Sequence, residues 1–212
     1  MKHTRTKETY GGFLPLELNK GQEWFEPYED SLMRFNSVKA SISYVVESTG
    51  VKKIQIPYYY CPSTSQAIKN MGIVVLFYHI DDNLMPIDLI DEFNTAVLFV
   101  DYFGIRAEEI KQRIGDTKDS LVIVDFAHDF FENPIMKAKV WNIYSAKKFF
   151  GIPDGSYVAS SDLQKENQEG SLSFDYASYL LKTFEQGTDA AYHDKKAADY
   201  TIANNYDAMS CL

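Results

Sequence analysis

Two groups of polar residues follow strands that the sequence predicts. Asp125 ends the apolar run LVIVD, and His128 follows three positions later. Ser145, Lys147 and Lys148 come directly after the run VWNIY. Because ligands of an open α/β sheet bind outside the carboxyl ends of its strands, we expect these side chains to face one site.

A third group begins the helix predicted over residues 37–47, for which Asn36 is a candidate N-cap. Ser37 offers a hydroxyl and Lys39 a positive charge, and the free N–H groups of a first helical turn bind phosphate. A lysine that forms an imine with an aldehyde and a carboxylate that pairs with a pyridine nitrogen complete the set that pyridoxal 5'-phosphate (PLP) requires. The three groups together indicate a PLP site.

Each of these signals also has a purely structural interpretation. An Asp at a strand end is often a turn or cap residue, and a single His is more often a hydrogen-bonded structural residue. Lys147 and Lys148 can be a solvated pair, and the aromatic run at residues 58–60 can serve packing alone. Only the order and spacing of the signals favour the cofactor site.

Apolar runs alternate with stretches of helical pattern along the first three quarters of the chain. The predicted strands are Lys53–Pro57, residues 73–78, residues 96–102, Leu121–Asp125, residues 140–144 and Ser156–Ala159. The predicted helices are residues 37–47, 62–71, 86–93 and 107–114. Near-continuous β-branched runs suit a parallel sheet that is buried on both faces. We therefore expect an α/β fold, with a three-layer, mostly parallel sheet flanked by helices.

The pattern changes after about residue 163. Residues 171–184 and 190–204 are predicted to be helical, and no strand is predicted among them. One apolar face is expected on the first of these helices, formed by Tyr176, Tyr179, Leu180, Leu181 and Phe184. We expect residues 1–165 to form the large α/β domain and residues 166–212 a separate helical segment.

Composition argues against several classes of function. The net charge of −9 disfavours a nucleic acid partner, and 45% hydrophobic with 24% charged residues is typical of a globular protein. Cys61 and Cys211 form no metal-binding spacing, and no dinucleotide or P-loop motif is present. The polar start lacks a signal peptide pattern and no run could span a membrane, so we expect a cytoplasmic protein.

Several segments, in this order, resemble fold-type I PLP enzymes of the DegT/DnrJ/EryC1/StrS group, best known as sugar aminotransferases. They are IPYYYCPS at 56–63, GIVVLFYHID at 72–81, VDYFG at 100–104, VDFAH at 124–128 and YSAKKFFGIPDG at 144–155. The resemblance runs from about residue 11 to residue 159. Its lysine segment and its Asp-x-x-His segment are the most specific.

The resemblance implies a role for each candidate. Lys148, with Lys147 as the fallback, forms the Schiff base and then moves a proton between substrate and cofactor. Asp125 holds the protonated pyridine nitrogen, and His128 lies near the 3-oxygen of the ring. The other implied cofactor contacts are Ser37, Val38 and Lys39 at the phosphate, Ser145 of the Ser-x-x-Lys motif, and Tyr60 or Cys61 on the ring face.

The sequence departs from the family pattern in four ways. Val38 replaces a glycine of the phosphate loop, and Cys61 stands where an aromatic residue usually stacks on the ring. Ile143 replaces a hydroxyl residue five positions before the lysine. Family members also carry a small C-terminal domain, which we expect to be largely missing here because the sequence stops near residues 207–210, where that domain would begin.

By analogy with the family, the expected activity is transfer of an amino group from an amino acid, glutamate by expectation, to a keto sugar nucleotide. A related PLP enzyme such as a dehydratase, racemase or lyase is an alternative, although the family's sugar dehydratases have a histidine in place of Lys148. A second alternative is a catalytically impaired, PLP-binding or dimerising relative without the C-terminal domain, which Val38 and the short chain favour. The resemblance also implies a homodimer.

Overall fold

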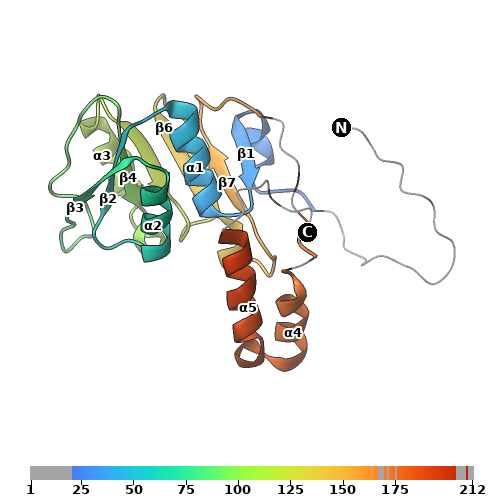
Figure 1. Cartoon of the computed structure of the whole chain (residues 1–212). Coiled ribbons are helices and arrows are strands. Elements are labelled where there is room, and N and C mark those ends of the chain that lie inside the picture. Colours follow the sequence, from blue (N-terminus) through green and yellow to red (C-terminus); the bar gives the residue numbers. More distant parts are fainter. Residues whose placement is uncertain (1–20, 167–169, 171, 175, 204–208, 210–212) are drawn as a thin grey trace.

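The computed structural model describes residues 21–166, 170, 172–174, 176–203 and 209. Its centre is a seven-stranded sheet with the order β1-β7-β6-β5-β4-β2-β3 (Figure 1). The strands are β1 (Leu32–Phe35), β2 (Lys53–Pro57), β3 (Val74–Tyr78), β4 (Thr95–Val100), β5 (Leu121–Asp125), β6 (Val140–Ser145) and β7 (Ser156–Ala159). Strands β2 to β6 pair in parallel, whereas β7 is antiparallel to both β6 and β1. The mostly parallel sheet is as predicted.

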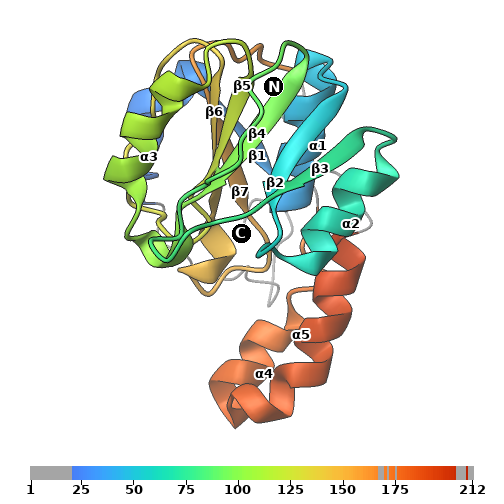
Figure 2. The same cartoon turned by 90° about the vertical axis from the view of Figure 1, so that its left-hand side faces the viewer.

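Helices cover both faces of the sheet. They are α1 (Val38–Thr49), α2 (Pro62–Asn70) and α3 (Ala107–Arg113). Figure 2 shows α1 and α2 on one face and α3 on the other. Strand β4 alternates between the two layers: Ala96, Leu98 and Val100 join the core beneath α1, and Val97 and Phe99 join the core beneath α3. This three-layer α/β architecture confirms the predicted fold class.

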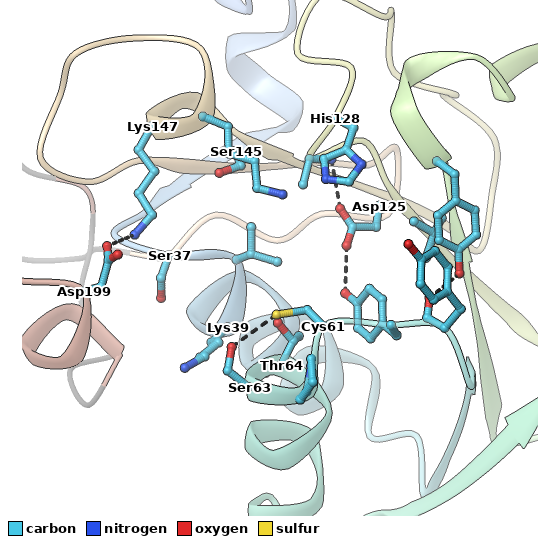
Figure 3. A pocket seen from close by; sticks show the side chains of 18 of the residues that line it. Ser37, Lys39, Cys61, Ser63, Thr64, Asp125, His128, Ser145, Lys147 and Asp199 are labelled. Carbon is cyan, nitrogen blue, oxygen red and sulfur yellow. Dashed lines mark hydrogen bonds and ion pairs between the residues drawn. The ribbon is translucent and has the colours of Figure 1, made fainter. Parts of the chain in front are cut away.

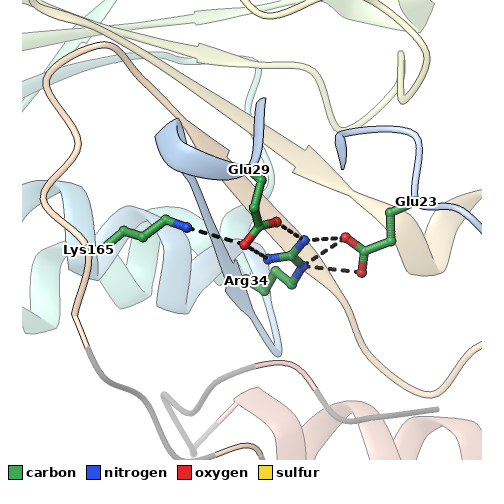
Figure 4. Close-up of polar contacts among 4 residues, drawn as sticks. All are labelled: Glu23, Glu29, Arg34 and Lys165. Atoms are coloured by element: carbon green, nitrogen blue, oxygen red, sulfur yellow. Dashed lines mark hydrogen bonds and ion pairs between the residues drawn. The ribbon is translucent and has the colours of Figure 1, made fainter. Parts of the chain in front are cut away.

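All six predicted strands are present, and their ends lie within two residues of the predicted positions. Strand β1 was not predicted, because it is only four residues long and carries a charge at Arg34. That guanidinium pairs with Glu23 and Glu29, and Glu29 in turn pairs with Lys165 at 3.2 Å (Figure 4). The network joins the edge strand to the segments on either side of it.

The helix predicted over residues 86–93 is wrong. This connection is irregular, and its backbone groups bond to side chains of other segments. Gln55 of β2 accepts the N–H of Ile90 at 2.8 Å and donates to the carbonyl of the same residue. The Asp91 carboxylate accepts N–H groups of residues 118–120. These long-range bonds take the place of helical ones, and the local sequence does not encode them.

The N-cap of α1 also differs from the prediction. Ser37, and not Asn36, is the capping residue: its backbone is extended and its Oγ accepts the N–H of Ala40 at 3.2 Å. The helix ends at Gly50, whose left-handed φ of 65° suits glycine. Because α1 follows β1 directly, its N-terminus lies at the carboxyl edge of the sheet.

Beyond the sheet the chain forms a helical hairpin. It consists of α4 (Ser178–Gln186) and α5 (Thr188–Ala203), which extend from the carboxyl edge of the sheet (Figures 1 and 2). Tyr176, Tyr179, Ala198 and Ile202 form its small core. The predicted apolar face is therefore only partly correct, because Leu181 and Phe184 of that face are exposed.

The first hairpin helix begins at Ser178, later than the predicted residue 171. The described residues between 172 and 177 are not helical. The predictions for residues 1–20, 204, 207, 208, 210 and Cys211 lie outside the described residues. No helix in the described ranges is long and apolar enough to cross a membrane.

Candidate functional site

A cavity of about 540 Å³ opens at the carboxyl edge of the sheet (Figure 3). The ends of β5 and β6, the first turns of α1 and α2, and the last part of α5 contribute to its wall. The cavity brings together all the residues predicted for the site, namely Ser37, Val38, Lys39, Tyr60, Cys61, Asp125, His128, Ser145, Lys147 and Lys148. Sequence positions from 37 to 148 thus meet in one place.

Asp125 is buried at the end of β5 and its carboxylate is fixed by two donors. The N–H of Ala127 donates to Oδ1 at 2.9 Å, and the Tyr60 hydroxyl donates to Oδ2 at 2.7 Å. Burial, together with the charge of Asp125, raises the pKa of Tyr60 well above its usual value, so this hydroxyl remains a donor at neutral pH. Tyr60 is therefore a partner of the carboxylate.

The two lysines after β6 differ in their surroundings. The Nζ of Lys147 lies 2.9 Å from Oδ1 of Asp199 in α5, and Figure 3 shows this side chain directed away from Asp125. Within the described ranges Lys148 makes no hydrogen bond or ion pair, although it lines the same cavity. Lys148 is thus the amine of the pair that has no partner in the described part of the chain.

Two helices begin at the cavity wall. Ser37, Val38 and Lys39 line it from the start of α1, and residues 61–64 line it from the start of α2. Free N–H groups at such termini favour an anion. Val38 also packs against the core beneath α1, and Ile143 is fully buried in that same core. Ile143 therefore contributes packing and makes no contact with the cavity.

Cys61 precedes α2 and faces the cavity. Burial would raise the pKa of its thiol, but hydrogen bonds from Ser63 and Thr64 outweigh burial and lower the pKa below its usual value. Its sulfur lies 3.3 Å from the Ser63 hydroxyl. The position therefore carries a polarised thiol where the resemblance predicts an aromatic ring.

His128 lies between Asp125 and a neighbouring aromatic ring. Phe103 stacks on the imidazole with a centroid distance of 6.2 Å, and the N–H of Phe103 donates to Nδ1 at 3.4 Å. Burial, and then the charge of Lys148, lower the pKa of His128, whereas Asp125 opposes them. The imidazole is consequently neutral at pH 7 and accepts a hydrogen bond at Nδ1.

The cavity also contains residues that sequence reasoning missed. Tyr102 and Phe103 follow β4, and the segment VDYFG at 100–104 already pointed to this strand end. Asp199 and Ile202 come from α5. No local signal identifies Asp199, because its partner Lys147 lies 52 positions earlier in the chain.

Comparison by sequence finds no matching protein family and no matching curated relative. Solved structures do match. Histidinol-phosphate aminotransferase from Clostridium acetobutylicum has a TM-score of 0.50 at 16% identity, over 86% of this chain and 60% of its own. A PLP-bound protein from Clostridium difficile 630, assigned as an aminotransferase, has a TM-score of 0.51 at 15% identity, over 84% and 54%. DesI, in the presence of its TDP-sugar product, has a TM-score of 0.50 at 14% identity, over 66% and 40%.

Identities this low show the fold alone. The chain shares the fold of these aminotransferases over the part that it covers, a mostly parallel sheet flanked by helices. The chain spans 40% to 60% of the length of these three proteins.

Proposed function

We propose that the chain binds PLP in this cavity and uses it to transfer an amino group. One observation carries the proposal: a lysine without a partner in the described ranges, a carboxylate fixed by two donors and a helix N-terminus line one cavity. Amine, carboxylate and oriented N–H groups are the groups that PLP requires. The residues present therefore fit this cofactor.

Each residue then has a defined task. When bound, PLP supplies an aldehyde carbon and an electron-withdrawing ring. Asp125, oriented by Ala127 and Tyr60, would hold the proton of the pyridine nitrogen. Lys148 would bond covalently to the cofactor and carry a proton at Nζ. The first-turn N–H groups of α1, with the hydroxyl of Ser37 and the charge of Lys39, would bind the phosphate.

The remaining predicted contacts follow from the same arrangement. Val38 would contribute its N–H group, because its side chain packs partly against the core. Cys61 would pack on the ring face, since the hydroxyl of Tyr60 is engaged by Asp125. His128 would accept or share a proton near the 3-oxygen of the ring, and Ser145 would border the phosphate side.

For the substrates, we propose an amino acid donor, glutamate, and a keto sugar nucleotide as acceptor. The resemblance of the lysine and Asp-x-x-His segments to sugar aminotransferases supports this, as does the TDP-sugar product of DesI. The alternative is a PLP-binding relative that does not turn over. It is favoured by Val38, whose side chain stands at the cavity-lining start of α1 where the resemblance predicts a glycine.

Adding glutamate to the PLP-loaded chain tests the activity directly. We expect release of 2-oxoglutarate, with about one equivalent per bound cofactor in the absence of an acceptor. Lys148→Ala is the control and should release none. If PLP binds but no 2-oxoglutarate forms, the non-catalytic alternative replaces the aminotransferase.

A further inference from the structure

The helical hairpin and the residues just before it make polar contacts with the segment that carries the two lysines. The Tyr176 hydroxyl lies 3.0 Å from Oδ2 of the fully buried Asp154, and the Tyr179 hydroxyl donates to the carbonyl of Ile152 at 3.4 Å. Both contacts are made to the loop between Lys148 and β7. The hairpin is therefore attached to the loop that follows the lysines.

A third contact reaches the lysines themselves. Asp199 of α5 pairs with Lys147 at 2.9 Å and with Lys195 of its own helix at 2.7 Å. Burial would raise the pKa of Asp199, but hydrogen bonds from Lys195 and Lys147 outweigh burial and lower it. The carboxylate is thus charged at neutral pH, and it lines the cavity beside Lys147.

Two adjacent primary amines in one cavity create an ambiguity. Either nitrogen can attack an aldehyde: its lone pair forms a bond to the carbonyl carbon, two N–H protons leave, and the oxygen departs as water. The attack requires an amine that is free to approach. Lys147 is held against α5, whereas Lys148 has no partner in the described ranges.

We propose that Asp199 is a positioning residue that selects Lys148 over Lys147 for covalent attachment of the aldehyde by holding Lys147 against α5. The proposal rests on the proposed PLP-binding function. It gives the hairpin a role in the site, because Asp199 of α5 determines which of the two lysines is free to react. Asp199→Asn should release Lys147 while it retains the size of the side chain.

The first test needs no cofactor. Trace acetylation of the unloaded protein, followed by peptide mapping, measures the reactivity of each lysine. We expect Lys147 to become several-fold more reactive in Asp199→Asn, with Lys148 unchanged, and Asp199→Glu to restore the low reactivity. Asp194→Asn is the matched control, because it removes the Lys182–Asp194 ion pair of the same hairpin at 2.6 Å, away from the cavity.

The second test uses PLP and borohydride reduction in a Lys148→Ala background, where only Lys147 competes. Lys148→Ala/Asp199→Asn should carry several-fold more reduced adduct on Lys147 than Lys148→Ala alone. Equal Lys147 labelling with and without Asp199, in both tests, overturns the selection role. If the wild-type protein forms no adduct, the PLP proposal is overturned instead. The acetylation result then still shows whether the ion pair with Asp199 restrains Lys147.

Discussion

At the scale of single residues, Asp125 is the carboxylate on which cofactor affinity should depend most. In Asp125→Asn the amide oxygen can still accept the N–H of Ala127, and the amide NH2 group can donate to the Tyr60 hydroxyl. The fold should therefore persist. It removes the charge that would pair with the pyridinium. A charge-assisted hydrogen bond is worth about 1.5–3 kcal/mol, so the Kd for PLP should rise roughly 10- to 150-fold.

Fluorescence or absorbance titration with PLP measures this change. Tyr60→Phe is the matched control, since it removes a hydroxyl from the same carboxylate and leaves the charge. A Kd for Asp125→Asn within twofold of the wild-type value would contradict the role proposed for Asp125.

The predicted residues could be brought to one cavity from sequence because each lies directly beside a recognisable local pattern. Asp125 and Ser145 end apolar runs, and Ser37 precedes a helical one. Their position at the end of a predicted strand or the start of a predicted helix was therefore enough to place them at one edge of the sheet. Asp199 lacks such a signal, because its place depends on how a distant hairpin packs.

At the scale of elements, the loops after β4 and β5 approach closely at Gly104. Its φ is 70°, and a Cβ there would lie 2.8 Å from the carbonyl oxygen of His128. Gly104→Ala should lower the free energy of unfolding by more than the roughly 1–2 kcal/mol that a left-handed conformation costs an L-residue. It should also weaken PLP binding, because the loop that carries His128 must move.

Gly50→Ala provides the control for this prediction. Its φ is 65°, but a Cβ there would meet no atom within 4 Å. Urea unfolding of both variants separates backbone strain from the clash. If both variants lose the same free energy of unfolding, the clash between the two loops adds nothing to the cost of the Gly104→Ala substitution.

The same two loops carry a pair of carboxyl groups. Burial, with the adjacent Asp129, raises the pKa of Asp101 to about 6, although the N–H of Arg106 opposes the shift. An unfolded Asp titrates near 3.9, so the folded state binds more protons between these values, and stability falls as pH rises from about 4 to about 6.

Asp101→Asn should remove this dependence, because an amide can donate to Asp129 without a proton from solution. We expect the variant to be roughly 1–3 kcal/mol more stable than wild type at pH 7.5, with the difference vanishing near pH 4. Urea unfolding at both pH values measures it. Parallel stability curves for the two proteins between pH 4 and pH 7.5 would exclude a proton shared by the pair.

At the scale of the whole molecule, the sheet could be predicted from sequence because buried parallel strands are nearly continuous apolar runs. Strand β1 could not, since it is only four residues long and carries the charge of Arg34. The irregular connection at residues 86–93 could not either, since it is stabilised by Gln55 of the distant strand β2. The packing of the hairpin on the lysine segment is likewise long-range. Such contacts between segments far apart in the chain leave no local sequence pattern from which they could be predicted.

The proposed enzyme should also be a homodimer, as its resemblance to the sugar aminotransferases implies. The connection between β3 and β4 exposes Ile87, Ile90 and Phe93, and exposed apolar side chains of this kind are typical of protein interfaces. Light scattering of the purified chain should give twice the mass of one chain. A monomer at micromolar concentration would contradict this part of the proposal.

The central claim is that Lys148 holds PLP, and borohydride reduction of the PLP-loaded chain followed by peptide mapping tests it most directly. We predict one reduced adduct, on Lys148, with a visible absorbance band before reduction that Lys148→Ala loses. An adduct that remains unchanged in Lys148→Ala, or a folded protein that forms none, would contradict the claim.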